Sequence, residues 1–299
     1  MLISAVNRLL ITIFSVTIST VFAFCVAYGV LLFGNNRTVE LPANDELGSA
    51  LEAGIVWLVE NKEKVLQHNN HVLWWLVQQA AEKTGDPRLE DLFAKYFDRY
   101  MGTTGTSFWR PLFKPGSWVP VRFDQIQDLL YYNWHMIYAI TCDADLGNIP
   151  QIAEQNDPEY CSRYLLKPAC ATHQLMGLRF MQLSECGDQD QLAESITHVS
   201  DTIHRQLVWD VRVVDVYIQR VLMLVETGHM ELVKPVWVSN ILDAQLEDGG
   251  WANKQPLLEV SDNLYLGFTG RGIATFHKQK GDFHATAQGV YLLSLLAKH

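Results

Sequence analysis

One arrangement recurs along the sequence and limits the fold more than any other feature. An apolar helix ends in a short turn that contains glycine, and an amphipathic helix follows. The ends of such apolar helices lie in segments 74–86, 175–188 and 217–228. Because this unit returns at intervals of roughly 40 residues, with insertions, the sequence predicts an internal repeat of α-hairpins.

Repeated hairpins of this kind close into a double ring, with the apolar helices inside and the amphipathic helices outside. Residues 44–299 contain about five such hairpins, and no strand pattern of any length is visible in them. The sequence therefore predicts an all-α domain, an incomplete α/α toroid. In this interpretation residues 247–282 form a long, glycine-rich loop.

The N-terminal part of the chain is dominated by an apolar run. Residues 9–33 carry no charge and, at about 1.5 Å per residue, can cross a hydrocarbon core of roughly 30 Å. We therefore predict a tail over residues 1–8, a transmembrane anchor over 9–33, a linker over 34–43 and the toroid domain over 44–299. The first predicted partner is thus a lipid bilayer.

A cleaved signal peptide is the alternative to an anchor. Such a peptide has a shorter apolar core followed by small residues at a cleavage site, whereas here the run continues through residues 28–33. We therefore favour an uncleaved single span. Arg8 and Arg37 flank the run almost symmetrically, so the charge bias is slight. The short N-terminal tail favours a cytoplasmic N-terminus and a domain on the periplasmic or extracellular side.

The charge balance argues against nucleic acid as a partner. The formal net charge is −10, and all 33 acidic residues lie from Glu40 onward. Binding of phosphate backbones needs a basic face, and the sequence has no compact cluster of lysine and arginine.

The number and spacing of the cysteines bear on disulfide bonds in the predicted domain. Cys25 lies in the apolar run, and the other four, which lie between residues 142 and 186, are Cys142, Cys161, Cys170 and Cys186. An even, clustered set in an extracytoplasmic domain indicates one or two disulfides, for which three pairings exist. Reduced thiols are the alternative, and a zinc site is disfavoured because no Cys-x-x-Cys pair is present.

The C-terminal region carries a resemblance to a known superfamily. A helix ends in Gln-x-x-Asp-Gly-Gly-Trp at residues 245–251, and after a loop a new helix opens at His284-Ala-Thr-Ala-Gln-Gly. Over residues 217–296 this pattern resembles the α/α toroids of the terpenoid cyclase and protein prenyltransferase superfamily. The resemblance implies structural roles at the helical turns for Gln245 and Trp251, and we expect Asp248 to close its turn.

The catalytic motifs of that superfamily are not carried over. The Asp-x-Asp-Asp motif of squalene and hopene cyclases is absent from the sequence. Asp282-x-His284 has histidine where protein prenyltransferases have a zinc-binding cysteine, and no close-spaced histidine pair lies on one helix face. We therefore predict no metal site, and the sequence leaves the cofactor unidentified.

Histidines near the starts of predicted inner helices are the candidate catalytic residues. These are His71, His173 and His284, together with Asp282 two residues before His284. Parallel inner helices bring their N-termini to one mouth, where the field is positive and imidazoles can exchange protons near neutral pH. The alternative is that each histidine is an ordinary polar residue near a helix cap.

Aromatic residues and one further histidine are the candidate ligand-binding residues. Trp109 and Trp118 lie in a segment rich in proline and glycine, where aromatic side chains either pack on the domain or cover a cleft. His135 lies well inside its helix, and Tyr265 lies in the long loop. Together with the anchor, these residues favour a protein of the cell envelope that binds a small molecule, a glycan or a protein in the toroid cavity.

An enzyme is the alternative function. A cyclase, transferase or lyase would use the histidines and Asp282 for acid–base chemistry at the helix N-termini. The sequence alone does not decide between the two functions, and we treat enzymatic activity as open.

Overall fold

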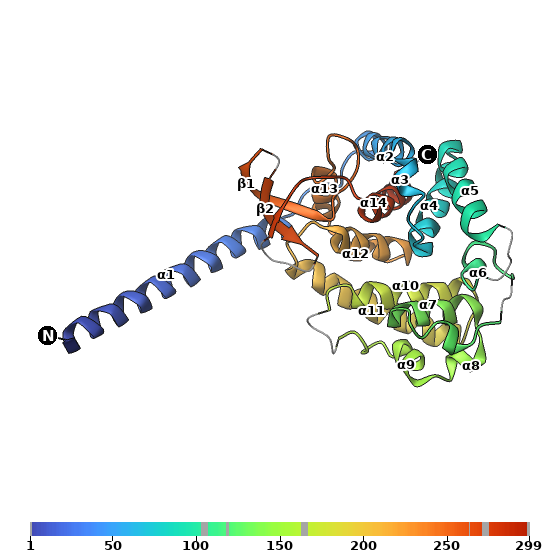
Figure 1. The fold of residues 1–299 in the computed structure, drawn as a ribbon, viewed down its shortest axis with the longest axis horizontal. Coiled ribbons are helices and arrows are strands. Elements are labelled where there is room, and N and C mark those ends of the chain that lie inside the picture. Colours follow the sequence, from blue (N-terminus) through green and yellow to red (C-terminus); the bar gives the residue numbers. More distant parts are fainter. Residues whose placement is uncertain are drawn as a thin grey trace.

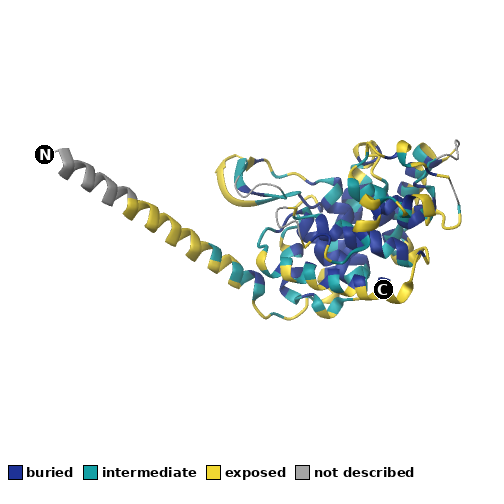
Figure 2. Ribbon diagram, turned by 90° about the horizontal axis from the view of Figure 1, so that it is seen from below, coloured by how far each residue is buried: buried dark blue, intermediate teal, exposed yellow. Residues whose placement is uncertain are grey.

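The computed structural model describes residues 2–102, 107–117, 120–162, 167–262, 264–270 and 275–297, with side chains from Phe14 onward. It is mostly helical, as the sequence predicts, and its first helix projects away from a helical body that contains the rest of the described chain (Figure 1). The body buries a continuous apolar core, whereas the projecting helix is largely exposed (Figure 2).

Helix α1 (Leu2–Asn36) contains the predicted anchor and extends beyond it at its C-terminal end. Its segment Phe14–Asn36 is long and apolar enough to cross a membrane, and none of that segment's most apolar window is buried. The same length and composition also fit a signal sequence. The last turn is fixed to the body through Asn35, whose Nδ2 donates to Leu207 O and whose Oδ1 accepts from Tyr217 Oη.

Among the helices longer than one turn, those with the largest share of buried residues are the ones predicted to be apolar. They are α4 (His71–Thr84), α7 (Tyr131–Thr141), α10 (Cys170–Leu183), α12 (Asp215–Glu226) and α14 (Phe283–Leu296). Helix α14 packs against both α4 and α12, and α10 packs against both α12 and α7. The short helix α6 (Arg110–Phe113) contacts both α7 and α4. The C-terminal helix therefore packs beside the first helices of the body.

Helices with a smaller share of buried residues cover this set. They are α2 (Asn44–Glu60) with the short α3 (Lys62–Val65), α5 (Pro87–Met101), α11 (Gln189–Trp209) and α13 (Pro235–Asp243). Helix α2 contacts α14, α5 contacts α4, and α11 contacts α10 and α12. Between α7 and α10 the described chain forms the short helices α8 (Ala144–Gly147) and α9 (Pro150–Ala153) and a 3-10 turn at 154–156. Two further 3-10 turns lie before α7, at 123–125, and after α12, at 230–232.

The turns between helices use the residues that the sequence singled out. Gly85 has a φ of 65° and ends α4, and Asp86 caps α5 by accepting a hydrogen bond from Arg88 N at 2.8 Å. At the next such turn Gly187 has a φ of 81°, and Asp188 caps α11. A β-carbon is strained at positive φ, so glycine is the residue that these helix ends favour.

The prediction of an all-α domain is wrong for the segment after Trp251. Strands β1 (Lys254–Ser261), β2 (Leu264–Thr269) and β3 (Thr275–His277) form an antiparallel sheet in the order β1-β2-β3. Its pattern is hidden in the sequence because Pro256 interrupts β1 and the register shifts on both sides of Leu258 and Glu259. Proline is tolerated there because β1 is an edge strand.

Two disulfides join the four clustered cysteines. Cys142 pairs with Cys186 across 44 positions, and Cys161 pairs with Cys170 across 9. The first links the end of α7 to the residues just after α10, and the second joins Cys161 to the first residue of α10. Cys25 is the free thiol among the described cysteines and is exposed on α1.

Candidate functional site

The N-terminal halves of the most buried helices line one cavity of about 480 Å³. Each helix contributes at least one polar side chain: His71 from α4, Asn133 from α7, His173 from α10, Gln219 from α12 and His284 from α14. We call this space the histidine cavity. The structure thus brings together three of the histidines that the sequence predicts to converge.

His71 opens α4, directly after Asn70, whose side chain caps the helix by accepting from Leu73 N. Its Nδ1 hydrogen-bonds with Tyr96 Oη at 2.5 Å, and its ring lies 5.2 Å from that of Trp109. No hydrogen bond joins Nε2 to the described part of the chain. Burial lowers the pKa of His71 to about 4, so the imidazole is neutral at physiological pH.

His173 lies in the first turn of α10. Its Nδ1 lies 2.6 Å from the carbonyl oxygen of Ala169, which can only accept, so Nδ1 carries the proton. The neutral ring therefore has an unprotonated Nε2. Burial, helped by the neighbouring His284, lowers the pKa of His173 to about 4, and the hydrogen bond to the Ala169 carbonyl acts in the opposite direction.

Two buried glutamines complete the polar lining. Gln219 accepts a hydrogen bond from Thr172 Oγ1 at 3.0 Å, which links α12 to α10. Gln288 lies one turn after His284 and is 1% exposed, yet its Oε1 has no hydrogen-bond partner in the described part of the chain. An unpaired buried amide oxygen destabilises the folded state by about 1–3 kcal/mol. A ligand that donates a hydrogen bond to this oxygen would offset that destabilisation.

Besides the polar residues Asn69, Asn70 and Ser107, the remaining lining is apolar or aromatic. Trp109 is nearly buried, and Tyr132 stacks on His173 with ring centroids 4.0 Å apart. Met136 and Met176 also line the cavity. Among the described residues that line the cavity there is no lysine, arginine, aspartate or glutamate. The cavity therefore combines uncharged hydrogen-bonding groups with aromatic surfaces.

Asp282 is not part of this cavity. Its Oδ1 caps α14 by accepting from His284 N at 2.9 Å, and its side chain borders a separate cavity near Trp57 and His68. Asp282 was predicted to lie with the three histidines, but it is not among the residues that line the histidine cavity. The reason is local, because an aspartate directly before a helix satisfies the helix's first N–H groups.

The four candidate ligand-binding residues lie in different places. Trp109 lines the histidine cavity, whereas His135 is fully buried and hydrogen-bonds through Nε2 to Asn156 Oδ1 at 2.9 Å. Tyr265 lies on β2, against His277, away from the cavity lining. Trp118 lies outside the described residues.

The residues with expected structural roles make contacts between elements. Gln245 Nε2 donates to Ala50 O at 2.8 Å, and Asp248 Oδ2 accepts from Trp57 Nε1 at 3.1 Å. Trp251 is fully buried, donates through Nε1 to Ile241 O, and lies against Gly289 so closely that a β-carbon there would meet its ring at 2.8 Å. These contacts fix the turn after α13 to α2 and α14.

Sequence reasoning missed Tyr132, Asn133, Gln219 and Gln288. A signal for the glutamines is present, because each is a polar residue in a helix that is mostly apolar. Such residues are buried only where a partner or a cavity accepts them.

Neither a metal-binding arrangement nor a similarity to a known protein identifies the function of the cavity. Within the described residues no group of three or more histidine, cysteine, aspartate or glutamate side chains is arranged to hold a metal ion. No protein-family model matches the chain, and no curated protein or solved structure matches it either.

Proposed function

We propose that the chain is a membrane-anchored α/α-toroid protein that binds a neutral, hydroxyl-rich ligand of the glycan type in the histidine cavity. The observation that carries the proposal is the lining of that cavity. Helix N-termini, neutral imidazoles, amides and aromatic rings meet in it without a charged side chain among its described residues.

The contacts between helices support the toroid. The order α4–α14–α12–α10–α7 describes successive neighbours, and α6 contacts both ends of this series. The more amphipathic helices lie on the outside of the same series. In such a ring the inner helices run in parallel, which accounts for the presence of all their N-terminal halves at one cavity.

The chemistry of the lining supports a neutral, hydroxyl-rich ligand. His173 Nε2 and Gln288 Oε1 accept hydrogen bonds, and amide N–H groups donate them. Trp109 and Tyr132 offer apolar surface to the C–H faces of a sugar ring. A hydroxyl both donates and accepts, so it suits each of these groups.

The anchor and the disulfides support a location in the cell envelope. Segment Phe14–Asn36 is apolar enough to span a bilayer, and two disulfides join the cysteines of the body. Disulfides persist in oxidising compartments, so we place the body on the periplasmic or extracellular side.

A panel of neutral and charged glycans, tested by calorimetry on the full chain in nanodiscs, examines this proposal. We expect a neutral glycan to bind, and Trp109→Ala and Gln288→Leu each to weaken binding roughly tenfold, equivalent to about 1.4 kcal/mol. Tyr265→Ala is the control and leaves the affinity unchanged. Binding of charged glycans alone, or equal loss in the control variant, would contradict the proposal.

A second candidate function is catalysis in the same cavity, favoured by the state of His173. An unprotonated Nε2 with a pKa near 4 can accept a proton at neutral pH, and His284 lies close enough to affect that pKa. Incubation of the bound glycan with the protein, followed by mass spectrometry, distinguishes the two functions. A product whose formation His173→Ala abolishes at saturating glycan establishes an enzyme, whereas an unchanged glycan establishes a binding protein.

A further inference from the structure

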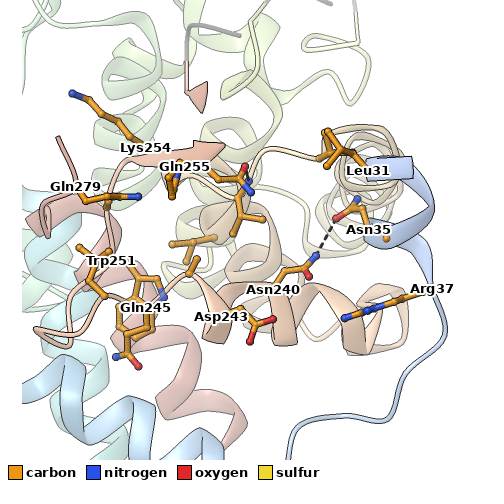
Figure 3. A pocket seen from close by; sticks show the side chains of 18 of the residues that line it. Leu31, Asn35, Arg37, Asn240, Asp243, Gln245, Trp251, Lys254, Gln255 and Gln279 are labelled. Carbon is orange, nitrogen blue, oxygen red and sulfur yellow. Dashed lines mark hydrogen bonds between the residues drawn. The ribbon is translucent and has the colours of Figure 1, made fainter. Parts of the chain in front are cut away.

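A second cavity, of about 490 Å³, lies between the end of α1, helix α13 and the base of the sheet (Figure 3). Its walls include Val30, Leu31 and Gly34 from the segment of α1 that is apolar enough to span a membrane. We call it the anchor cavity. Because part of its wall belongs to this segment, the cavity would open where α1 leaves the bilayer if α1 spans a membrane.

Aromatic residues mark the level of the membrane surface. Tyr28 Oη donates to the backbone carbonyl of Trp209 at 2.6 Å, and the Trp209 side chain at the end of α11 is 62% exposed. Tyrosine and tryptophan concentrate at the membrane–water interface. The residues from Leu9 to Ala27 then span roughly 28 Å, which matches the hydrocarbon core. Val30, Leu31 and Gly34 therefore lie at headgroup level.

The sheet carries an exposed apolar row on the same side of the body. Leu258, Leu266 and Phe276 are paired across β1, β2 and β3, and Leu258 and Phe276 are 61% and 63% exposed. Phe268 lies on the same face of the sheet as these three residues and packs against Val214 of the helical body. The exposed row therefore extends outward from the point where the sheet meets the body. Figures 1 and 2 show the sheet projecting from the body on the side of α1.

The polar groups of the anchor cavity have both signs of charge. Arg37 follows the end of α1, and Asp243 is the last residue of α13; Figure 3 shows their side chains on the same edge of the cavity. Within the described chain no ion pair joins either one to another side chain. Gln279, in the same lining, has a buried Oε1 without a partner among the described residues.

We propose that the anchor cavity binds the zwitterionic headgroup of a bilayer phospholipid, of the phosphoethanolamine type, while the row of Leu258, Leu266 and Phe276 lies in the same bilayer. Arg37 pairs with the phosphate, and Asp243 and the Gln279 oxygen accept from the ammonium group. The apolar wall formed by Val30 and Leu31 follows the start of the acyl chains. The inference rests on the membrane anchoring in the proposed function, and it adds a lipid class and a second membrane contact.

The membrane contact is tested with an environment-sensitive fluorophore on the full chain in nanodiscs. Leu258→Cys is labelled in a Cys25→Ser background, since the other cysteines form disulfides. Gln191→Cys is the control, because it lies about 27 Å along α11 from Trp209. We expect nitroxide lipids to quench the label at position 258 several-fold more than the label at 191. Equal quenching would overturn the membrane contact of the sheet.

The headgroup is tested by the lipids that remain bound after extraction from mixed bilayers of phosphatidylcholine, phosphatidylethanolamine and phosphatidylglycerol. We expect severalfold enrichment of phosphatidylethanolamine, lost in Arg37→Gln and in Asp243→Asn. Arg122→Gln and Asp124→Asn remove an exposed pair elsewhere and retain the enrichment. Enrichment of phosphatidylglycerol, no enrichment, or full competition by soluble phosphoethanolamine would each overturn the proposal.

The outcomes separate this inference from the proposed function. Release of the protein by alkaline extraction would show that α1 does not anchor it, and both the anchor and the lipid site would fail. Loss of glycan binding with retained lipid enrichment would contradict only the function proposed for the histidine cavity. Retained glycan binding without lipid enrichment would contradict only the proposed lipid site.

Discussion

His173 lies against Tyr132 with ring centroids 4.0 Å apart and an interplanar angle of 28°. The two residues come from α10 and α7, which are neighbours in the body, and both line the histidine cavity. This stacking covers one face of the imidazole and contributes to the burial that keeps it neutral. The properties of His173 therefore depend on a residue some forty positions earlier in the chain.

Removal of the Tyr132 ring should raise the pKa of His173. In Tyr132→Ala water reaches the imidazole, so we expect its pKa to move from about 4 toward the ordinary value of about 6.5. The measurement is an NMR titration of the histidine side chains. Tyr132→Phe retains the stacked ring and is the control in which the pKa stays low; an equal rise in both variants would contradict the role of stacking.

Acid should destabilise the fold through its buried histidines. Burial lowers the pKa values of His71, His135 and His173 to about 4, whereas the unfolded chain titrates near 6.5. Between these values the unfolded state binds more protons, so stability falls as the pH drops from about 6.5 to about 4. The effect is at most about 3 kcal/mol per histidine, and urea unfolding of the full chain at several pH values measures it.

A His135→Gln variant should lose part of this pH dependence. His135 is fully buried and its Nδ1 has no partner within the described residues, so protonation inside the fold is strongly disfavoured. We expect a shallower fall in stability with acid than in the original chain. His198→Gln, which replaces an exposed histidine paired with Glu159, should leave the slope nearly unchanged. Equal slopes in the two variants would exclude His135 as a contributor.

Trp251 should dominate the packing at the turn after α13. It is fully buried between Gly54 and Gly289, and its indole donates to Ile241 O. We expect Trp251→Ala to lower the free energy of unfolding by about 3–5 kcal/mol. Trp209→Ala, at an exposed position, should change it by about 0.5 kcal/mol or less in detergent. A small loss at Trp251 would show that this turn does not hold the body together.

The two disulfides should differ in their contributions. The Cys142–Cys186 pair closes a loop of 44 positions and the Cys161–Cys170 pair one of 9. Loop-closure entropy then predicts roughly 4 kcal/mol for the first and roughly 2.5 kcal/mol for the second. Double alanine variants of each pair, compared by denaturant unfolding under oxidising conditions, measure the difference. A larger loss from the shorter loop would contradict the entropic account.

The helices were predictable from the sequence because their apolar spacing and end signals are local. Gly85 with Asp86 and Gly187 with Asp188 mark the same helix ends in the sequence and in the structure. The sheet was not predictable in this way, because Pro256 and two register shifts break the alternation of β1. Its exposed apolar row also lacks the alternation of a half-buried strand.

The site was predictable only where helix position decided it. His71, His173 and His284 share a place near the start of buried helices, and that place fixes them at one cavity. Asp282 has a similar position in sequence, but a residue directly before a helix points its carboxylate back at the N–H groups. Tyr132, Gln219 and Gln288 depend on which helices become neighbours, and sequence spacing alone does not determine that.

Photoaffinity labelling tests the central claim most directly. A neutral glycan that carries a diazirine group is bound to the full chain in nanodiscs and activated by light, and the modified residues are identified by mass spectrometry. We predict adducts on the wall of the histidine cavity, at Met136, Met176 or Tyr132, that excess unlabelled glycan prevents. Adducts confined to the sheet or the anchor cavity, or no adducts that the unlabelled glycan prevents, would contradict the account.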